Sequence, residues 1–268
     1  MSSTPAYAPR LAQIRIHPIK SLEPVVVSES TIGPSGGLTH DRAWALFSVD
    51  GKWVNGKRTP VIHLIRASYA PDLHSVTISV PNDRRNIPTR TFAFPQAHED
   101  AAEWFSVFFD QQIIIRNSPE GFPDDSIANG PTIISTATLQ TVCEWFPGIT
   151  IDEARLRFRT SLEIDGVPPF WEDRLFPSNP RNVVRFRIGD VNFEGSNPCA
   201  RCPVPSRDPF TGLSRDGFQK LFAQLRQASL PATTPREPFD HFYRLATNTR
   251  VASTEVGKPL RLTDPLIL

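Results

Sequence analysis

The chain has little of several features that would identify a class of protein at once. Only three of its 268 residues are cysteine, so it has no disulfide framework, and the odd count fits a reducing compartment. The formal net charge is +1 and no basic stripe is visible, which argues against a protein built to bind nucleic acid. No apolar run is long enough to cross a bilayer, and the first ten residues contain no signal-peptide core and no Arg-rich amphipathic helix. A cytoplasmic location is therefore the expectation.

Proline, by contrast, is abundant: there are 27 prolines beside 14 glycines. Because proline is excluded from helix interiors and central strands, the chain must be broken into short elements. Alternating apolar and polar residues predict strands, and apolar residues at i, i+3, i+4 and i+7 predict helices. The expected strands are 13–17, 75–80, 184–188 and 191–193, and the expected helices are 100–109, 136–146 and 216–227. The predicted class is mostly β (α+β), with a hairpin at Gly189-Asp190 and a few helices.

One cysteine has a plain structural interpretation. Cys143 falls on the apolar stripe of the helix predicted behind a capping Ser135. A free cysteine in that position behaves as a small apolar side chain. We therefore expect no chemistry from Cys143.

The other two cysteines lie two residues apart in the stretch N-P-C-A-R-C-P-V-P-S-R-D-P-F-T-G, residues 197–212. Its prolines predict neither a regular helix nor a regular strand. A structural zinc site needs four ligands, yet there is no second C-x-x-C and the six histidines are scattered. A thioredoxin-type dithiol would begin a helix, which the prolines prevent. What remains is a pair of loop thiols flanked by Arg201 and Arg207, whose charges favour a nucleophilic or metal-binding thiolate. Two idle loop cysteines are the alternative.

Cationic residues form a second pattern. Lys20-Ser21 follows an alternating strand and a proline, and Asp41-Arg42 precedes an apolar run. Three arginines that alternate with apolar residues predict a strand with a row of guanidinium groups on one face: Arg155, Arg157 and Arg159. Such a row needs anionic balance. Either it binds phosphate, which suits the planar arginine fork, or it is a solvated face paired with Asp152, Glu153 and Glu163.

Five pieces of the sequence, taken in order, resemble the MOSC-domain proteins that carry an N-terminal β-barrel extension, as in the mitochondrial amidoxime-reducing component and its bacterial relatives. The pieces are IHPIKSLEP, GLTHDRAWALFSVDGKWVNGKRTP, FRTSLEIDGVPPFWEDRLF, PCARCPVPSRDPFTG and GKPLRLTDPLIL. Each alone is a weak signal, whereas five in the same order are a strong one. The resemblance implies a MOSC-type β-barrel packed with an N-terminal β-barrel-like domain. It divides the chain into residues 10–118 and 119–268, with a cofactor cleft between the two.

The resemblance also implies a cofactor, the molybdenum cofactor (Mo-molybdopterin), with a cysteine thiolate on the metal. Cys202 matches that ligand and Cys199 is the alternative. The positions that match cofactor contacts are Lys20, Ser21, Arg42 and Arg159. Ser135 and Thr136 open a helix, whose N-terminus is itself an anion site. Asp208, close to Cys202 in sequence, is a candidate for proton handling, with capping of its own loop as the other role.

The activity that the resemblance implies is reduction of N-hydroxylated compounds. The sequence has no G-x-G-x-x-G, no C-x-x-C-H and no four-cysteine cluster motif, so the electrons would come from an external donor. The family suggests a cytochrome b5 and its reductase. The alternatives are a carrier or storage protein for the same cofactor, or a sulfur-transfer protein. Pyridoxal phosphate binding is an attribute of the family only, since this chain has no pyridoxal-phosphate domain. The chain departs from the reductase pattern at Thr160-Ser161, which bears on the substrate more than on the cofactor.

Overall fold

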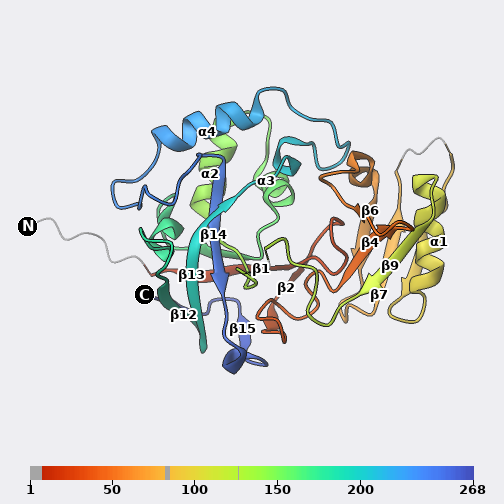
Figure 1. Ribbon diagram of the computed structural model, residues 1–268, viewed down its shortest axis with the longest axis horizontal. Coiled ribbons are helices and arrows are strands. Elements are labelled where there is room, and N and C mark those ends of the chain that lie inside the picture. The colour runs from red at the N-terminus through yellow and green to blue at the C-terminus, as the bar shows by residue number, and fades with distance from the viewer. Residues whose placement is uncertain (1–7, 82–84, 126) are drawn as a thin grey trace, which may run out of the picture.

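The computed structural model describes residues 8–81, 85–125 and 127–268 (Figure 1). Its strands are β1 (Arg10–Ile16), β2 (Val25–Val27), β3 (Glu29–Thr31), β4 (Trp44–Ser48), β5 (Trp53–Val54), β6 (Arg66–Tyr69), β7 (Ser75–Ser79), β8 (Arg90–Ala93), β9 (Ile113–Asn117), β10 (Ile133–Ser135), β11 (Leu162–Asp165), β12 (Val184–Ile188), β13 (Val191–Ala200), β14 (Arg244–Arg250), β15 (Pro259–Arg261) and β16 (Leu266–Ile267). Its α-helices are α1 (His98–Phe109), α2 (Thr136–Trp145), α3 (Ile151–Phe158) and α4 (Phe218–Ala228). Four 3-10 helices complete it: η1 (Pro60–Leu64), η2 (Trp171–Leu175), η3 (Val204–Ser206) and η4 (Ser253–Glu255). The mostly β class with a few helices is confirmed.

The largest sheet has eight strands in the order β16-β12-β13-β14-β10-β11-β1-β2. Its pairs are antiparallel except for β10 and β11, which are parallel. The alternation that predicts β1 places Ile14 and Ile16 in the core of this sheet, with Leu162 and Phe193 among their neighbours in the same cluster. The predicted hairpin at Gly189-Asp190 is confirmed as the β12–β13 connection.

A second group of elements lies at the other end of the molecule, on the right in Figure 1. It consists of two three-stranded sheets, β5-β4-β9 and β6-β7-β8, with α1 packed on them. The helical spacing buries Trp104, Phe105 and Phe108 from α1 against Val76 and Ile78 of β7. The strand predicted at 75–80 and the helix predicted at 100–109 are thus confirmed.

The remaining helices gather beside the large sheet (Figure 1) and share an aromatic cluster. Phe146, Phe218 and Phe222 have ring centroids 4.2 to 6.4 Å apart. The predicted cap of α2 is confirmed, because the Ser135 side chain accepts the Thr138 backbone N–H at 3.1 Å. Cys143 is partly buried against this cluster, and burial raises the pKa of its thiol, as a structural cysteine requires.

Two local predictions are wrong. The arginine row is not a strand but helix α3, which begins behind Thr150, whose side chain accepts the Glu153 N–H. Acidic residues in the first turn and arginines in the last turn suit the helix dipole, and Arg159 ends the helix in the left-handed conformation. The cysteine stretch is also partly regular, because β13 extends through Pro198 to Ala200. The strand tolerates Pro198 because its register with β14 shifts on either side of that residue.

The predicted division between residues 118 and 119 remains a prediction. Strands β1 and β2 lie before that boundary, yet they form one edge of the large sheet by pairing through β11. Within the described ranges no helix is both long enough and apolar enough to cross a membrane.

Candidate functional site

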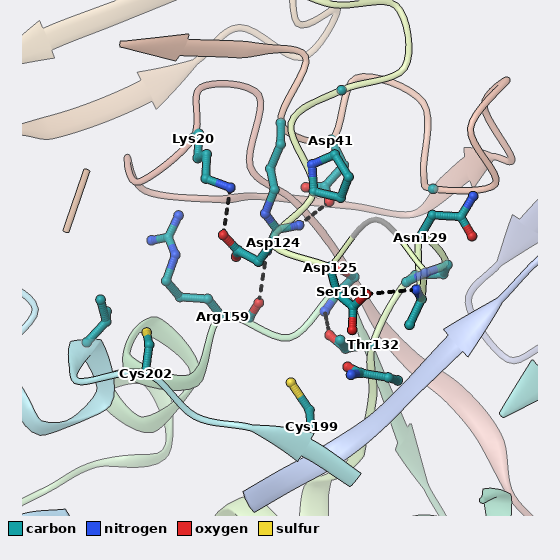
Figure 2. A pocket seen from close by; sticks show the side chains of 18 of the residues that line it. Lys20, Asp41, Asp124, Asp125, Asn129, Thr132, Arg159, Ser161, Cys199 and Cys202 are labelled. Carbon is teal, nitrogen blue, oxygen red and sulfur yellow. Dashed lines mark hydrogen bonds and ion pairs between the residues drawn. The ribbon is translucent and has the colours of Figure 1, made fainter. Parts of the chain in front are cut away.

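A pocket of about 610 Å³ opens where loops from the first half of the chain meet the cysteine segment (Figure 2). This volume lies in the usual range for small-molecule sites, roughly 300–1,000 Å³. The segments that line it fall within residues 20–21, 35–42, 55–63, 120–132, 157–161, 197–205 and 248. It joins six of the residues predicted from sequence: Lys20, Ser21, Arg42, Arg159, Cys199 and Cys202. Side chains as much as 182 positions apart are therefore brought to one cavity by the fold.

One wall carries the two thiols. Cys199 lies at the end of β13 and is half-buried, and its Sγ is 3.1 Å from an Arg201 guanidinium nitrogen. The same arginine donates to the Phe158 carbonyl at the end of α3, which fixes it against the helix. Cys202 follows in the loop after β13 and is exposed. The pocket therefore holds one accessible thiol and one thiol already in contact with a cation. Among the described residues, no cluster of three or more His, Cys, Asp and Glu side chains could hold a metal ion.

The opposite wall is cationic. Lys20 Nζ donates to the Phe122 carbonyl at 2.7 Å and to Asp124 Oδ1 at 2.6 Å, and it lies 5.2 Å from the Trp53 ring centroid. Burial lowers the pKa of Lys20, an effect that Asp124 opposes. Beside it, the Ser21 hydroxyl accepts the Gly56 N–H at 3.2 Å. This contact ties the Lys20 segment to the loop after β5.

Two guanidinium groups lie deeper. Both Arg42 and Arg159 have left-handed backbones, with φ of 52° each. Arg42 pairs with Asp41 and contacts the Arg159 carbonyl at 3.5 Å, while Arg159 donates to the Leu22 carbonyl at 2.8 Å. Burial and the neighbouring Arg42 lower the pKa of Arg159 to about 10, so both groups are charged at neutral pH.

Asp41 is held in place from behind. Its Oδ1 accepts the His17 backbone N–H at 2.8 Å. Burial would raise the pKa of Asp41, but Arg42 and His17 bring it down to about 2. The carboxylate is therefore charged throughout the physiological range and orients Arg42 toward the pocket wall.

Three of the predicted residues do not line this pocket. Ser135 is fully buried and caps α2, and Thr136 donates to Glu163 at 2.8 Å. Asp208 accepts the backbone N–H groups of Phe210 and Thr211 at 2.9 and 2.8 Å, which is the loop-capping role. Each uses its polar atoms within its own neighbourhood.

The pocket also contains residues that the motifs did not single out. Asp124 lies beside Lys20 (Figure 2), and Asn197, two residues before Cys199 in sequence, also lines the pocket. His63 is buried under the Gly56 loop, and its Nε2 has no hydrogen-bond partner in the described part of the chain. Burial and Arg159 lower the pKa of His63 to about 4, so the imidazole is neutral at pH 7. His63 follows the Arg-x-Pro piece by three positions and Asn197 precedes Cys199 by two, so proximity to the motifs is the signal that could have found them. No sequence signal identifies Asp124.

Comparison with known proteins gives one family match and several relatives of low identity. Residues 8–112 match the family of MOSC N-terminal beta barrel domains. The chain is 26% identical over 238 residues to a protein named mitochondrial amidoxime-reducing component 1 of Mus musculus, covering 76% of this chain and 67% of the relative. It is 25% identical to mitochondrial amidoxime reducing component 2 of Bos taurus, with 76% and 68% covered. It is also 24% identical to a molybdenum cofactor sulfurase of Caenorhabditis briggsae, where 77% of this chain matches 30% of that protein.

These findings identify residues 8–112 as similar to the MOSC N-terminal beta barrel domains. Over most of its length the chain is similar, at low identity, to proteins named mitochondrial amidoxime-reducing components. One group of relatives is named for the molybdenum cofactor.

Proposed function

We propose that this protein binds the molybdenum cofactor in the pocket of Figure 2 and reduces N-hydroxylated compounds with electrons from an external donor. The observation that carries the proposal is the meeting of an accessible thiol, Cys202, with the cations Lys20, Arg42 and Arg159 in one cavity. A soft thiolate suits a molybdenum centre and a set of cations suits a phosphate, and the cofactor has both parts. The chemistry of the residues present therefore fits the group.

In this proposal Cys202 is the metal ligand, because it is the exposed thiol of the pair. Cys199 is the alternative, although its sulfur is already in contact with Arg201. Lys20 and Arg159 bind the anionic end, Ser21 adds a hydroxyl, and Arg42 is held in position by Asp41. Ser135, Thr136 and Asp208 act outside the pocket in this proposal, in caps and turns.

When bound, the cofactor would supply a two-electron redox centre for the reduction of an N-hydroxyl group, which takes two electrons from the external donor and two protons and releases water. The chain's own side chains bind and orient the ligands. His63 is a neutral imidazole at pH 7, so it can exchange a hydrogen bond with a polar ligand without adding charge. The amide of Asn197 and the backbone around Cys199 give the wall beside the thiols further polar groups.

The test is molybdenum per chain, measured by mass spectrometry on protein from a host that makes the cofactor. We expect near-stoichiometric metal in the wild type, loss in Cys202→Ala and retention in Cys143→Ala, the matched control in helix α2. Cys199→Ala decides between the two thiols, because loss of metal in that variant alone would move the ligand to Cys199. A wild type that carries no molybdenum would end the proposal.

A second function shares every binding residue: a carrier or sulfur-transfer protein for the same cofactor. The similarity to molybdenum cofactor sulfurases favours it. Turnover separates the two. A reductase consumes a benzamidoxime-type substrate when supplied with a cytochrome b5 and its reductase, the donor we propose, whereas a carrier binds molybdenum and does not turn over.

The remaining parts of the proposal concern the whole chain. We infer that the protein works in the cytoplasm, although relatives are named as mitochondrial. We also infer that residues 10–118 and 119–268 form the two domains of one cooperative unit, with the cofactor between them. Fractionation of the native host and a structure with the cofactor bound are the respective checks.

A further inference from the structure

The pocket already contains an anion of its own. Asp124 extends from the loop between β9 and β10, and its Oδ1 lies 2.6 Å from Lys20 Nζ (Figure 2). The side chain of Asp124 is 78% exposed whereas that of Lys20 is 10% exposed. The carboxylate therefore approaches the buried cation from the open side of the pocket, the side from which a ligand would come.

Asp124 interacts with more than one cation. Desolvation by the surrounding protein would raise the pKa of the Asp124 carboxyl, but Arg42, Lys20 and Arg159 outweigh it, so the pKa is lowered. The carboxylate of Asp124 therefore interacts electrostatically with all three cations of the pocket, Lys20, Arg42 and Arg159. An incoming phosphate would find three cations opposed by two carboxylates, those of Asp41 and Asp124.

The two carboxylates have different roles. Asp41 also lines the pocket, but it is only 10% exposed, and its oxygens are used by Arg42 and by the His17 N–H. Asp124 has no such structural use among the contacts of the described residues: its one hydrogen bond is to Lys20. Removing the charge of Asp124 therefore leaves the Asp41–Arg42 pair in place and changes only the net charge that the pocket presents to a ligand.

We propose that Asp124 is an internal competitor that occupies the anion position of the pocket, so that an anionic ligand binds only by displacing it from Lys20. The inference rests on the proposed function, since the same cations are assigned there to the cofactor's phosphate. Asp124 then sets the selectivity of the site: a dianionic phosphate, attracted by all three cations, displaces the carboxylate more readily than a singly charged anion does.

The neighbouring Asp125 supplies a matched control. It also lines the pocket, but its Oδ1 accepts the backbone N–H groups of Ile127 and Ala128 at 2.9 and 3.1 Å. It caps a turn and makes no ion pair with Lys20. Asp124→Asn and Asp125→Asn change the net charge of the pocket equally, so only a positional effect distinguishes them.

The experiment is calorimetric titration of the purified full chain, prepared without cofactor, with inorganic pyrophosphate at low ionic strength in a buffer free of phosphate. Asp124→Asn should bind pyrophosphate about five- to tenfold more tightly than the wild type, the order expected when a competing ion pair and a like charge are removed. Asp125→Asn should gain less than twofold. Lys20→Gln should weaken binding in both the wild-type and the Asp124→Asn backgrounds, and thermal melts check that every variant is folded.

Two results would overturn the inference and they point to different causes. If pyrophosphate binds and depends on Lys20, but Asp124→Asn binds no more tightly than Asp125→Asn, the anion site stands and Asp124 is not its competitor. If no variant binds pyrophosphate, the pocket is not an anion site. That result would contradict both this inference and the assignment of Lys20, Arg42 and Arg159 to phosphate binding in the proposed function.

Discussion

His17 is a fully buried histidine whose two ring nitrogens have no hydrogen-bond partner in the described residues. Burial, together with Arg159, lowers its pKa from 6.5 to about 3. It lies behind the cation wall, beside Asp41 at 3.6 Å. A proton on His17 would place a further positive charge next to the two arginines, so the folded state favours the neutral ring.

This burial makes stability depend on pH. Between pH 6.5 and about 3 the unfolded chain binds a proton at His17 and the folded chain does not, so stability falls as the pH falls through this window. From pH 7 to pH 5 the wild type should lose about 2 kcal/mol of unfolding free energy through this group alone. Urea unfolding at the two pH values measures it. His17→Gln should show a loss smaller by that amount, while His74→Gln, at an exposed position, should keep the wild-type loss.

The pocket cysteines and cations could be predicted from sequence because each belongs to a short motif whose residue types suit one chemistry. Asp124 could not, because an acidic residue in an irregular loop has many possible roles until the fold places it beside Lys20. His63 could have been found only through its position three residues after the Arg-x-Pro piece, because a histidine in an apolar segment otherwise suggests a core residue. The Gly56 loop that lies over it makes it part of the cavity.

Among the elements, α2 begins at a cap that carries more than one contact. The Ser135 hydroxyl accepts the Thr138 N–H and also lies 2.8 Å from the Thr138 hydroxyl, which in turn accepts the Phe170 N–H at 2.6 Å. The cap therefore joins the start of the helix to the segment before η2. It is buried, so water cannot replace the lost hydrogen bond.

We therefore expect Ser135→Ala to destabilise the fold by about 1–2 kcal/mol, the range of a lost buried cap. Pyrophosphate affinity should stay unchanged, because Ser135 does not line the pocket. Denaturant unfolding and titration measure the two effects separately. Thr150→Ala, at the exposed cap of α3, is the matched control and should cost less. A Ser135→Ala protein of normal stability but weaker anion affinity would return Ser135 to the site.

Helix α3 illustrates why the rest of the fold could not be read from local pattern. An arginine at every second position has the period of a strand. Yet the Thr150 cap, the acidic first turn and the pairing of Arg157 with Glu153 at 2.6 Å all belong to a helix. Charge order and capping decided the element, and they outweighed a short alternation. The longer apolar patterns that predict α1 and α2 were not opposed by any conflicting pattern.

The molecule as a whole is joined by its first strand. Residues 8–112 match a domain family, and β1 pairs on one side with β2 from the same half of the chain. On its other side, however, β1 pairs with β11, which belongs to the second half. Separating the chain near residue 118 would leave Ile14, Ile16 and Leu162 without their packing partners. The cost of exposing this core favours a single cooperative unit.

Scanning calorimetry should accordingly show one unfolding transition for the whole chain, with equal calorimetric and van't Hoff enthalpies. Residues 1–118 and 119–268 expressed separately should both lack a cooperative melt. Two well-separated transitions in the intact protein would contradict this expectation and would favour independently stable halves.

The exposed thiol of Cys202 has a practical consequence. An alkylating reagent that diffuses into the pocket meets Cys202 in the open, whereas Cys199 and Cys143 are partly buried. Any occupant of the pocket shields the Cys202 sulfur, so the fraction of chains that the reagent labels quickly measures the fraction of empty pockets in a preparation. In air, oxidation of a protein with an empty pocket would begin at the Cys202 sulfur, whereas the surrounding fold would stay intact.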